Sequence, residues 1–221
     1  TLKVSPTIKP VSTTLKSETV KSDGVTGSYP VTPKAAARRQ LTCLFCDLVG
    51  STALSEQRDA EDFRQVILDY QQIAEGVIQQ HGGHIAQYLG DGLLVYFGYP
   101  KGLENAPKAA VQAGLGILEA VAKANGTVGA ELMVGDTFKV SPTIKPSPTF
   151  KIPINLRLGI PTGLVVVDDH LALGDTVNIA ARLEGLAPVN GMVISPQTLK
   201  LVQGWFAVKS LGKEVLKGIK A

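Results

Sequence analysis

The order in which strand-like and helix-like apolar patterns follow one another constrains the fold of this 221-residue chain most strongly. Short apolar or alternating runs predict strands at residues 40–47, 84–89, 93–98, 154–160, 163–167 and 191–195, and two more near 205–210 and 214–219. Helical spacing of apolar side chains predicts helices at residues 59–81, 104–124, 175–187 and 196–203. The order β-α-β-β-α-β is that of the split βαβ motif. We therefore expect an α+β fold with a ferredoxin-like core, an antiparallel sheet flanked by helices.

Two stretches of the chain lack this periodicity. Residues 1–37 are rich in Thr, Ser, Pro and Lys and are expected to be a low-complexity linker or tail. Residues 38–221 are expected to form one domain, which an irregular insertion interrupts at 125–153. The sequence Leu2–Pro10 recurs almost unchanged at Phe138–Pro146, and this repeat has no functional interpretation.

The net charge of +3 is located in the N-terminal tail. Residues 1–34 contain five lysines and two acidic residues, which gives +3, so the remainder is formally neutral. Because nucleic-acid-binding domains concentrate basic side chains on one face, this distribution argues against a nucleic-acid partner.

The sequence also carries indications of location. No apolar stretch has the length of a transmembrane helix and no signal-peptide pattern is present, so we expect a cytoplasmic segment without membrane insertion. The chain begins with Thr1 rather than Met, and we therefore expect further domains of a longer protein.

Cys43 and Cys46 are spaced as in zinc and redox motifs, but they lie within a predicted strand. An odd separation along a strand places two side chains on opposite faces of the sheet. Buried packing thiols in a reducing compartment are the favoured interpretation.

Two aspartates stand at the ends of apolar strand-like runs. Asp47 closes the first predicted strand, and Asp91 lies in the Gly-Asp-Gly turn of the predicted hairpin. Taken alone, Asp91 is typical of a tight turn and Asp47 of a helix cap. Together they are hard oxygen ligands of the kind that bind Mg²⁺ jointly with substrate phosphates, and we favour a metal site.

A second polar pair lies in the predicted helix at 175–187. Asn178 and Arg182 are four residues apart and therefore share one helix face, where they present an amide and a guanidinium group. With the two aspartates, this pair indicates nucleotidyl chemistry. Glu184, by contrast, is expected on a solvated face.

Six ordered motifs of the chain resemble those of the class III nucleotidyl cyclase catalytic domain, the adenylate/guanylate cyclases, most closely of bacterial type. The motifs are Arg38–Thr42, Phe45–Thr52, Tyr88–Gly92, Leu158–Gly163, Gly174–Arg182 and Leu216–Gly218. The resemblance covers residues 38–221 and implies the class III cyclase fold.

The resemblance also implies roles for individual residues. Asp47 and Asp91 match the pair that binds two Mg²⁺ (or Mn²⁺) ions. Asn178 resembles the residue that orients the ribose, and Arg182 resembles the arginine that stabilises charge on the α-phosphate. Residues that match the substrate-binding positions are Leu48, Val49, Gly50, Ser51 and Thr52 in a phosphate loop, and Lys217 at the terminal phosphates. Lys213 and Lys220 are close enough in the sequence to be alternatives to Lys217.

In this family each active site is shared between two subunits, with the aspartates from one and the asparagine and arginine from the other. Because this chain carries both halves, the resemblance implies a homodimer with two equivalent sites and an inactive monomer.

The base-selecting positions depart from the family pattern. Gln87 stands where adenylate cyclases usually have lysine and guanylate cyclases glutamate, and its partner position falls at Leu171. An amide both donates and accepts hydrogen bonds, so it suits either purine. The segment 164–173 is also shorter than the family's hairpin.

The favoured function is an adenylate cyclase that converts ATP to 3′,5′-cyclic AMP and pyrophosphate. A guanylate cyclase and a nucleotide-binding pseudocyclase that regulates a neighbouring domain remain as alternatives. A diguanylate cyclase would need a different turn from Leu89–Leu93.

Overall fold

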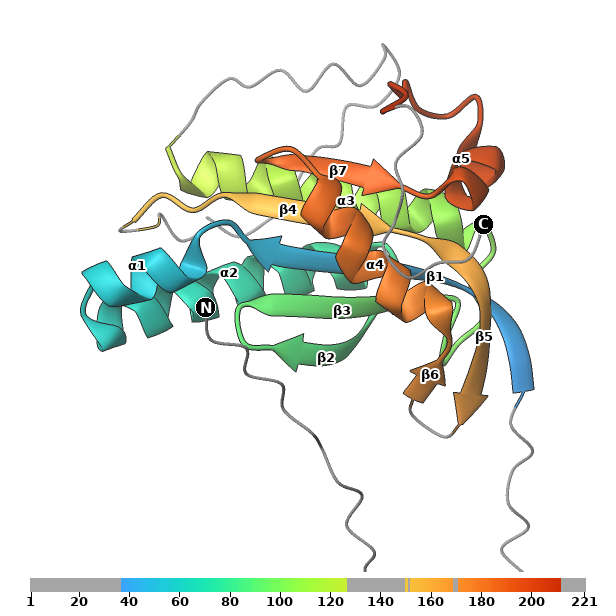
Figure 1. Cartoon of the computed structure of the whole chain (residues 1–221), viewed down its shortest axis with the longest axis horizontal. Helices are drawn as coiled ribbons and strands as arrows, with labels where there is room; N and C mark the ends of the chain where they lie inside the picture. Colours follow the sequence, from blue (N-terminus) through green and yellow to red (C-terminus); the bar gives the residue numbers. More distant parts are fainter. Residues whose placement is uncertain (1–36, 127–149, 151, 169–170, 212–221) are drawn as a thin grey trace, which may run out of the picture. The chain divides into compact units, whose positions relative to one another are not determined.

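The computed structural model describes residues 37–126, 150, 152–168 and 171–211 (Figure 1). The expected tail, nearly all of the expected insertion, the expected strand at 214–219 and Lys217 lie outside the described residues. None of the described helices combines the length and the hydropathy needed to cross a membrane.

Seven strands of the described chain form one sheet. They are β1 (Ala37–Leu48), β2 (His84–Leu89), β3 (Gly92–Phe97), β4 (Leu156–Ile160), β5 (Thr162–Asp168), β6 (Leu171–Leu173) and β7 (Gly191–Ile194). The main order is β2-β3-β1-β4-β7, and the pairs β2–β3, β3–β1 and β1–β4 are antiparallel, whereas β7 is parallel to β4. The order of the first four strands is that of the split βαβ core, which confirms the expected fold class.

The central strand β1 is long enough to pair with three neighbours. Its second half lies between β3 and β4, and its first half pairs with β5, which in turn pairs with the short strand β6. The change from β4 to β5 along the same edge occurs at Pro161, whose carbonyl accepts a hydrogen bond from Cys43 N at 3.0 Å.

Five helices are present in the described part of the chain. They are α1 (Ser51–Gln57), α2 (Ala60–Gln80), α3 (Ala106–Ala124), α4 (Asp175–Leu186) and α5 (Pro196–Val202). Two of them, α2 and α5, begin at side-chain caps. The side chain of Asp59 accepts a hydrogen bond from Glu61 N at the start of α2, and Ser195 caps α5 through Thr198 N. The expected helices at 59–81, 104–124, 175–187 and 196–203 are thus present with small shifts at their ends.

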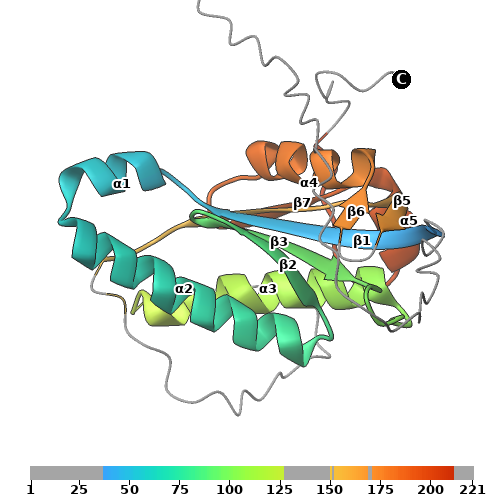
Figure 2. The same ribbon diagram turned by 90° about the horizontal axis from the view of Figure 1, so that it is seen from below.

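Helices cover both faces of the sheet (Figure 2): α2 and α3 lie on one face and α4 lies on the other. The larger core joins α2 and α3 to Cys46 and its same-face neighbours, and a smaller core on the α4 face contains Cys43. The two thiols are therefore free, buried and on opposite faces, as predicted. Burial raises the pKa of each to about 12.

One expected element is wrong. Residues 205–210 form a turn and irregular chain instead of a strand. Most of their side chains are exposed, so the segment has no buried face that a strand could present to a core. Trp205, 59% exposed, is covered on one side by Lys108, whose Nζ lies 3.2 Å from the ring centroid.

Helix α4 and strand β4 touch backbone to backbone at Gly159. A β-carbon placed on Gly159 would lie 2.2 Å from the carbonyl oxygen of Ala180 and 2.4 Å from the backbone nitrogen of Glu184. Only glycine allows so close an approach, so this residue fixes the distance of α4 from the sheet.

The change Gly159→Ala is therefore expected to lower the free energy of unfolding by about 3 kcal/mol or more, because the clash is with backbone atoms. Gly185→Ala is the matched control in α4, since no atom lies within 4 Å of its added β-carbon. It should leave stability unchanged or raise it by up to about 1 kcal/mol. Urea denaturation measures both, and equal midpoints for Gly159→Ala and the unaltered protein would contradict the expectation.

Candidate active site

The structure brings Asp47 and Asp91 together at one end of the sheet. Asp47 is the penultimate residue of β1, and Asp91 lies in the tight turn between β2 and β3. Their carboxyl groups lie near each other, since the charge of Asp91 raises the pKa of Asp47. Gly92 leaves room for the pair, because a β-carbon there would lie 3.1 Å from Asp47 Oδ1.

The electrostatics of this pair favour a bound cation. Burial, the charge of Asp91 and the charge of Glu184 raise the pKa of Asp47 to about 6. The Oδ2 atom of Asp91 is buried and has no hydrogen-bond partner among the described residues. Two adjacent carboxylates with an unsatisfied oxygen fit a hard divalent ion, which would neutralise their repulsion.

Two further charged residues, Arg157 and Glu184, border the pair from the α4 side. Arg157 of β4 lies directly opposite Asp47 of β1 in the antiparallel register, so both side chains leave the same face of the sheet. The Nε atom of Arg157 is buried and has no hydrogen-bond partner in the described part of the chain. An arginine so placed is suited to an anionic group from a ligand.

The expectation that Glu184 lies on a solvated face is wrong. It is half-buried, because the contact at Gly159 draws its segment of α4 onto β4. Burial raises the pKa of Glu184 and the charge of Asp91 raises it further, whereas Arg157 opposes the shift.

Arg157 is absent from the predicted site residues, although the sequence contains a signal for it. Arg157 is the one charged residue in the apolar strand Leu156–Ile160, and Gly159 follows it by two positions on the same face. A charged residue within an apolar strand, beside a glycine of close approach, indicates a functional site.

The residues predicted for the second half of the site lie elsewhere on α4. Asn178 and Arg182 are both exposed. Arg182 stands about 200° around the helix axis from Glu184, at 100° per residue. Arg182 therefore lies nearly opposite Glu184 on α4, and Asn178, six positions from Glu184, lies about 120° away from it around the axis.

The structure does not place the predicted base-selecting residues beside the aspartates. Gln87 is exposed on β2 beside an irregularity in the β2–β3 register. Leu171 lies in β6 opposite Asp168 of β5. Lys217 is outside the described residues.

The predicted phosphate loop, Leu48–Thr52, leads from β1 into α1. Gly50 adopts a left-handed conformation with φ of 72° and its carbonyl accepts the first hydrogen bond of α1, from Leu54 N. Val49 N already donates to Asn155 O at 2.8 Å, so this amide is not free for a phosphate.

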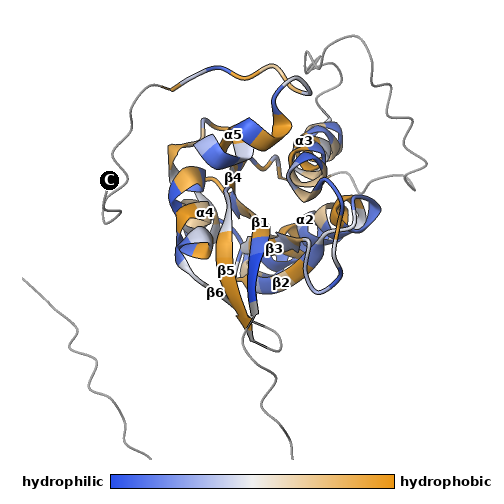
Figure 3. Ribbon diagram, turned by 90° about the vertical axis from the view of Figure 1, so that its right-hand side faces the viewer, coloured by the Kyte–Doolittle hydropathy of each residue, from blue (hydrophilic) through white to orange (hydrophobic). Residues whose placement is uncertain are grey.

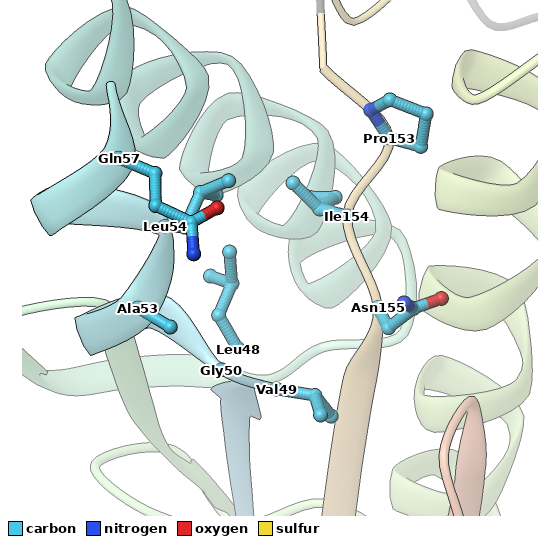
Figure 4. A pocket seen from close by; sticks show the side chains of 9 residues that line it. All are labelled: Leu48, Val49, Gly50, Ala53, Leu54, Gln57, Pro153, Ile154 and Asn155. Atoms are coloured by element: carbon cyan, nitrogen blue, oxygen red, sulfur yellow. The ribbon is translucent and has the colours of Figure 1, made fainter. Parts of the chain in front are cut away.

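A pocket of about 210 Å³ lies between α1 and the chain before β4 (Figure 4). Its wall includes Leu48, Gly50, Leu54, Gln57 and Asn155, but neither aspartate. The pocket therefore adjoins the loop and is separate from the carboxylate pair.

Comparison with known proteins identifies relatives for this arrangement. Residues 34–221 match the family model described as adenylate and guanylate cyclase catalytic domain. An adenylate cyclase of Anabaena cylindrica is 28% identical over 166 residues, which are 71% of this chain and 29% of that protein. The chain spans less than a third of the length of the bacterial curated relatives that it matches.

Solved structures share the fold. The adenylyl cyclase CyaB from P. aeruginosa is 26% identical with a TM-score of 0.70, over 84% of this chain and 91% of that one. The guanylyl cyclase Cya2 is 27% identical with a TM-score of 0.68, over 84% of this chain and 89% of that one. These neighbours confirm the expected cyclase fold and include both nucleotide specificities.

The raised pKa of Asp47 predicts how stability without metal depends on pH. Because the folded pKa of about 6 exceeds the usual 3.8, the folded state binds the proton more tightly than the unfolded state. This contribution is full below about pH 4 and is lost as the pH rises through about 6. Asp47→Asn should remove the loss and raise stability at pH 7 by on the order of 1 kcal/mol, after a discount for solvent screening.

Thermal denaturation in chelator at pH 4 to 7 measures this difference, with Glu56→Gln on the exposed face of α1 as the control. Parallel pH curves for Asp47→Asn and the unaltered protein would show that the pKa of Asp47 is not raised in the folded protein.

Proposed function

Because this chain belongs to the adenylate and guanylate cyclase catalytic domain family, we propose that it converts ATP to 3′,5′-cyclic AMP and pyrophosphate. The observation that carries the proposal is the adjacent pair Asp47 and Asp91, one with a raised pKa and the other with a buried oxygen that lacks a partner. Such a pair is costly for a folded protein unless a cation joins it.

Asp47 and Asp91 would hold two Mg²⁺ or Mn²⁺ ions. Bound divalent ions lower the pKa of an attacking hydroxyl and neutralise phosphate charge. Asp47 serves as a ligand only when ionised, so its raised pKa implies that metal affinity falls as the pH drops below about 6.

The chain supplies further groups for the triphosphate. Arg157 stands next to the aspartates and its buried Nε atom lacks a hydrogen-bond partner among the described residues, so a phosphate oxygen would satisfy this donor. The loop Leu48–Thr52 contributes its remaining amides, and Lys217 contributes a cation at the terminal phosphates.

In the reaction, the ribose 3′-oxygen attacks the α-phosphorus and its proton passes to solvent. The bond from the α-phosphorus to the bridging oxygen breaks, and pyrophosphate leaves with that oxygen. Asn178 orients the ribose and Arg182 stabilises the charge that develops on the α-phosphate.

Asn178 and Arg182 would act in the site of a partner subunit. Their exposure, on parts of α4 that are turned away from Glu184, favours this arrangement over a site within one chain. An exposed apolar side chain is consistent with an interface: Leu164 is 71% exposed on β5, a strand that is apolar along much of its length (Figure 3). We therefore infer a homodimer with two shared sites.

Guanylate cyclase activity is the second candidate, supported by the 27% identity to Cya2. Gln87 is exposed and offers both a donor and an acceptor, so its chemistry accepts either purine. Two bacterial relatives are named adenylate cyclases, and this supports ATP as the first candidate substrate.

Purified protein should form cyclic AMP from ATP with Mn²⁺ or Mg²⁺, and faster than it forms cyclic GMP from GTP. Asp91→Ala should lower the rate at least about 10²-fold, because it removes a metal ligand. Product chromatography with each nucleotide measures both rates. Faster formation of cyclic GMP would contradict the proposal and favour a guanylate cyclase. The absence of product with either nucleotide would favour the pseudocyclase.

The shared site predicts complementation between two inactive variants. Asp47→Ala and Arg182→Ala chains, mixed in equal amounts, should recover about a quarter of normal activity, because half the dimers are mixed and each has one intact site. Refolding the chains together before the assay allows exchange. Activity no higher than that of either variant alone would refute the sharing of sites between subunits.

A further inference from the structure

Two consecutive residues of α2 each donate a hydrogen bond to the residue that precedes one of the aspartates. Tyr70 Oη donates to the Sγ atom of Cys46, next to Asp47, at 3.1 Å. Gln71 Nε2 donates to the carbonyl oxygen of Gly90, next to Asp91, at 3.3 Å. The same turn of one helix thus contacts both segments that carry the carboxylate pair.

This helix is a firm support. Helix α2 spans 21 residues and packs on the sheet through Val66, Ile73, Ala74, Val77 and Ile78, all buried. Tyr70 is itself fully buried, so its ring holds the hydroxyl in place beneath β1. A donor on a rigid element positions its acceptor more narrowly than a donor on a loop does.

The turn that carries Asp91 needs such a support. The β2–β3 register is irregular between Ile85 and Gln87, so the strand ladder alone holds this hairpin less tightly. Gly90 adopts a left-handed conformation with φ of 67°, at the tip of the hairpin. The bond from Gln71 ties this tip to α2, whereas β1 is fixed between β3 and β4.

We propose that Tyr70 and Gln71 are positioning residues that set the spacing of Asp47 and Asp91 and thereby the affinity of the site for divalent metal. Neither side chain would touch the metal or the nucleotide; each acts through the residue before an aspartate. This inference rests on the proposed function, since it requires the two aspartates to be metal ligands. Residues that orient metal ligands typically change metal affinity about 10- to 100-fold when altered.

The test is a titration of the full chain with Mn²⁺. Electron paramagnetic resonance measures the concentration of the free ion. Tyr70→Phe removes only the hydroxyl, and Gln71→Met removes the donor at nearly constant shape. The matched control is Gln79→Met, because Gln79 lies on the same helix and donates within it, to Glu75 Oε1. We expect Tyr70→Phe and Gln71→Met each to weaken Mn²⁺ binding about tenfold, and Gln79→Met to leave it unchanged.

Kinetics provide a second readout that a purely structural role would not move. The metal concentration for half-maximal turnover should rise in Tyr70→Phe and Gln71→Met, whereas kcat at saturating Mn²⁺ stays near normal. Gln71 is only partly buried, so Gln71→Met is expected to fold. The metal-binding test can therefore be made with Gln71→Met even if Tyr70→Phe unfolds.

The outcomes separate the two proposals. Unchanged Mn²⁺ affinity in Gln71→Met, with an unaltered protein that binds Mn²⁺ and forms product, overturns the positioning role alone. An unaltered protein that neither binds Mn²⁺ nor forms product overturns the proposed function and this inference with it.

Discussion

The alternation of side chains along β1 is the constraint on which the other features depend. Leu44, Cys46 and Leu48 enter the core beneath α2 and α3, so the intervening residues must face α4. Asp47 therefore leaves the sheet on the α4 side, opposite Arg157 and near Glu184. A shift of one residue in register would place this carboxylate in the apolar core and expose its neighbours. The large hydrophobic core thus determines the face of the sheet from which Asp47 projects.

The site itself works against folding. Two neighbouring carboxylates and a buried Nε atom of Arg157 without a hydrogen-bond partner are unfavourable in the protein alone, and the metal-bound triphosphate of the proposed reaction would supply the charges that these groups lack. The surroundings tolerate this arrangement because it rests on rigid elements: the middle strand of the sheet, a helix fixed by backbone contact at Gly159, and the long helix α2. Local instability and firm support are both expected of a binding site.

Much of this arrangement follows from sequence because it is local. Apolar periodicity gives the strands and helices, and the strand ends give Asp47 and Asp91. Arg157 and Glu184 were not predicted as site residues. Their proximity to the aspartates depends on the β1–β4 register and on the approach of α4 at Gly159, and no single segment of the sequence reveals either. The expected strand at 205–210 failed for a similar reason: alternating apolar residues form a strand only where a partner edge is available, and here the segment is exposed.

The two cysteines of β1 give this protein a built-in chemical probe. Only the thiolate reacts with alkylating reagents, and a pKa of about 12 keeps both thiols protonated while the fold is intact. Because Cys43 lies in the core on the α4 face and Cys46 in the core beneath α2 and α3, modification of either one reports the opening of its own layer. The order in which the two sulfurs become reactive in denaturant thus distinguishes release of α4 from release of the helix pair on the other side.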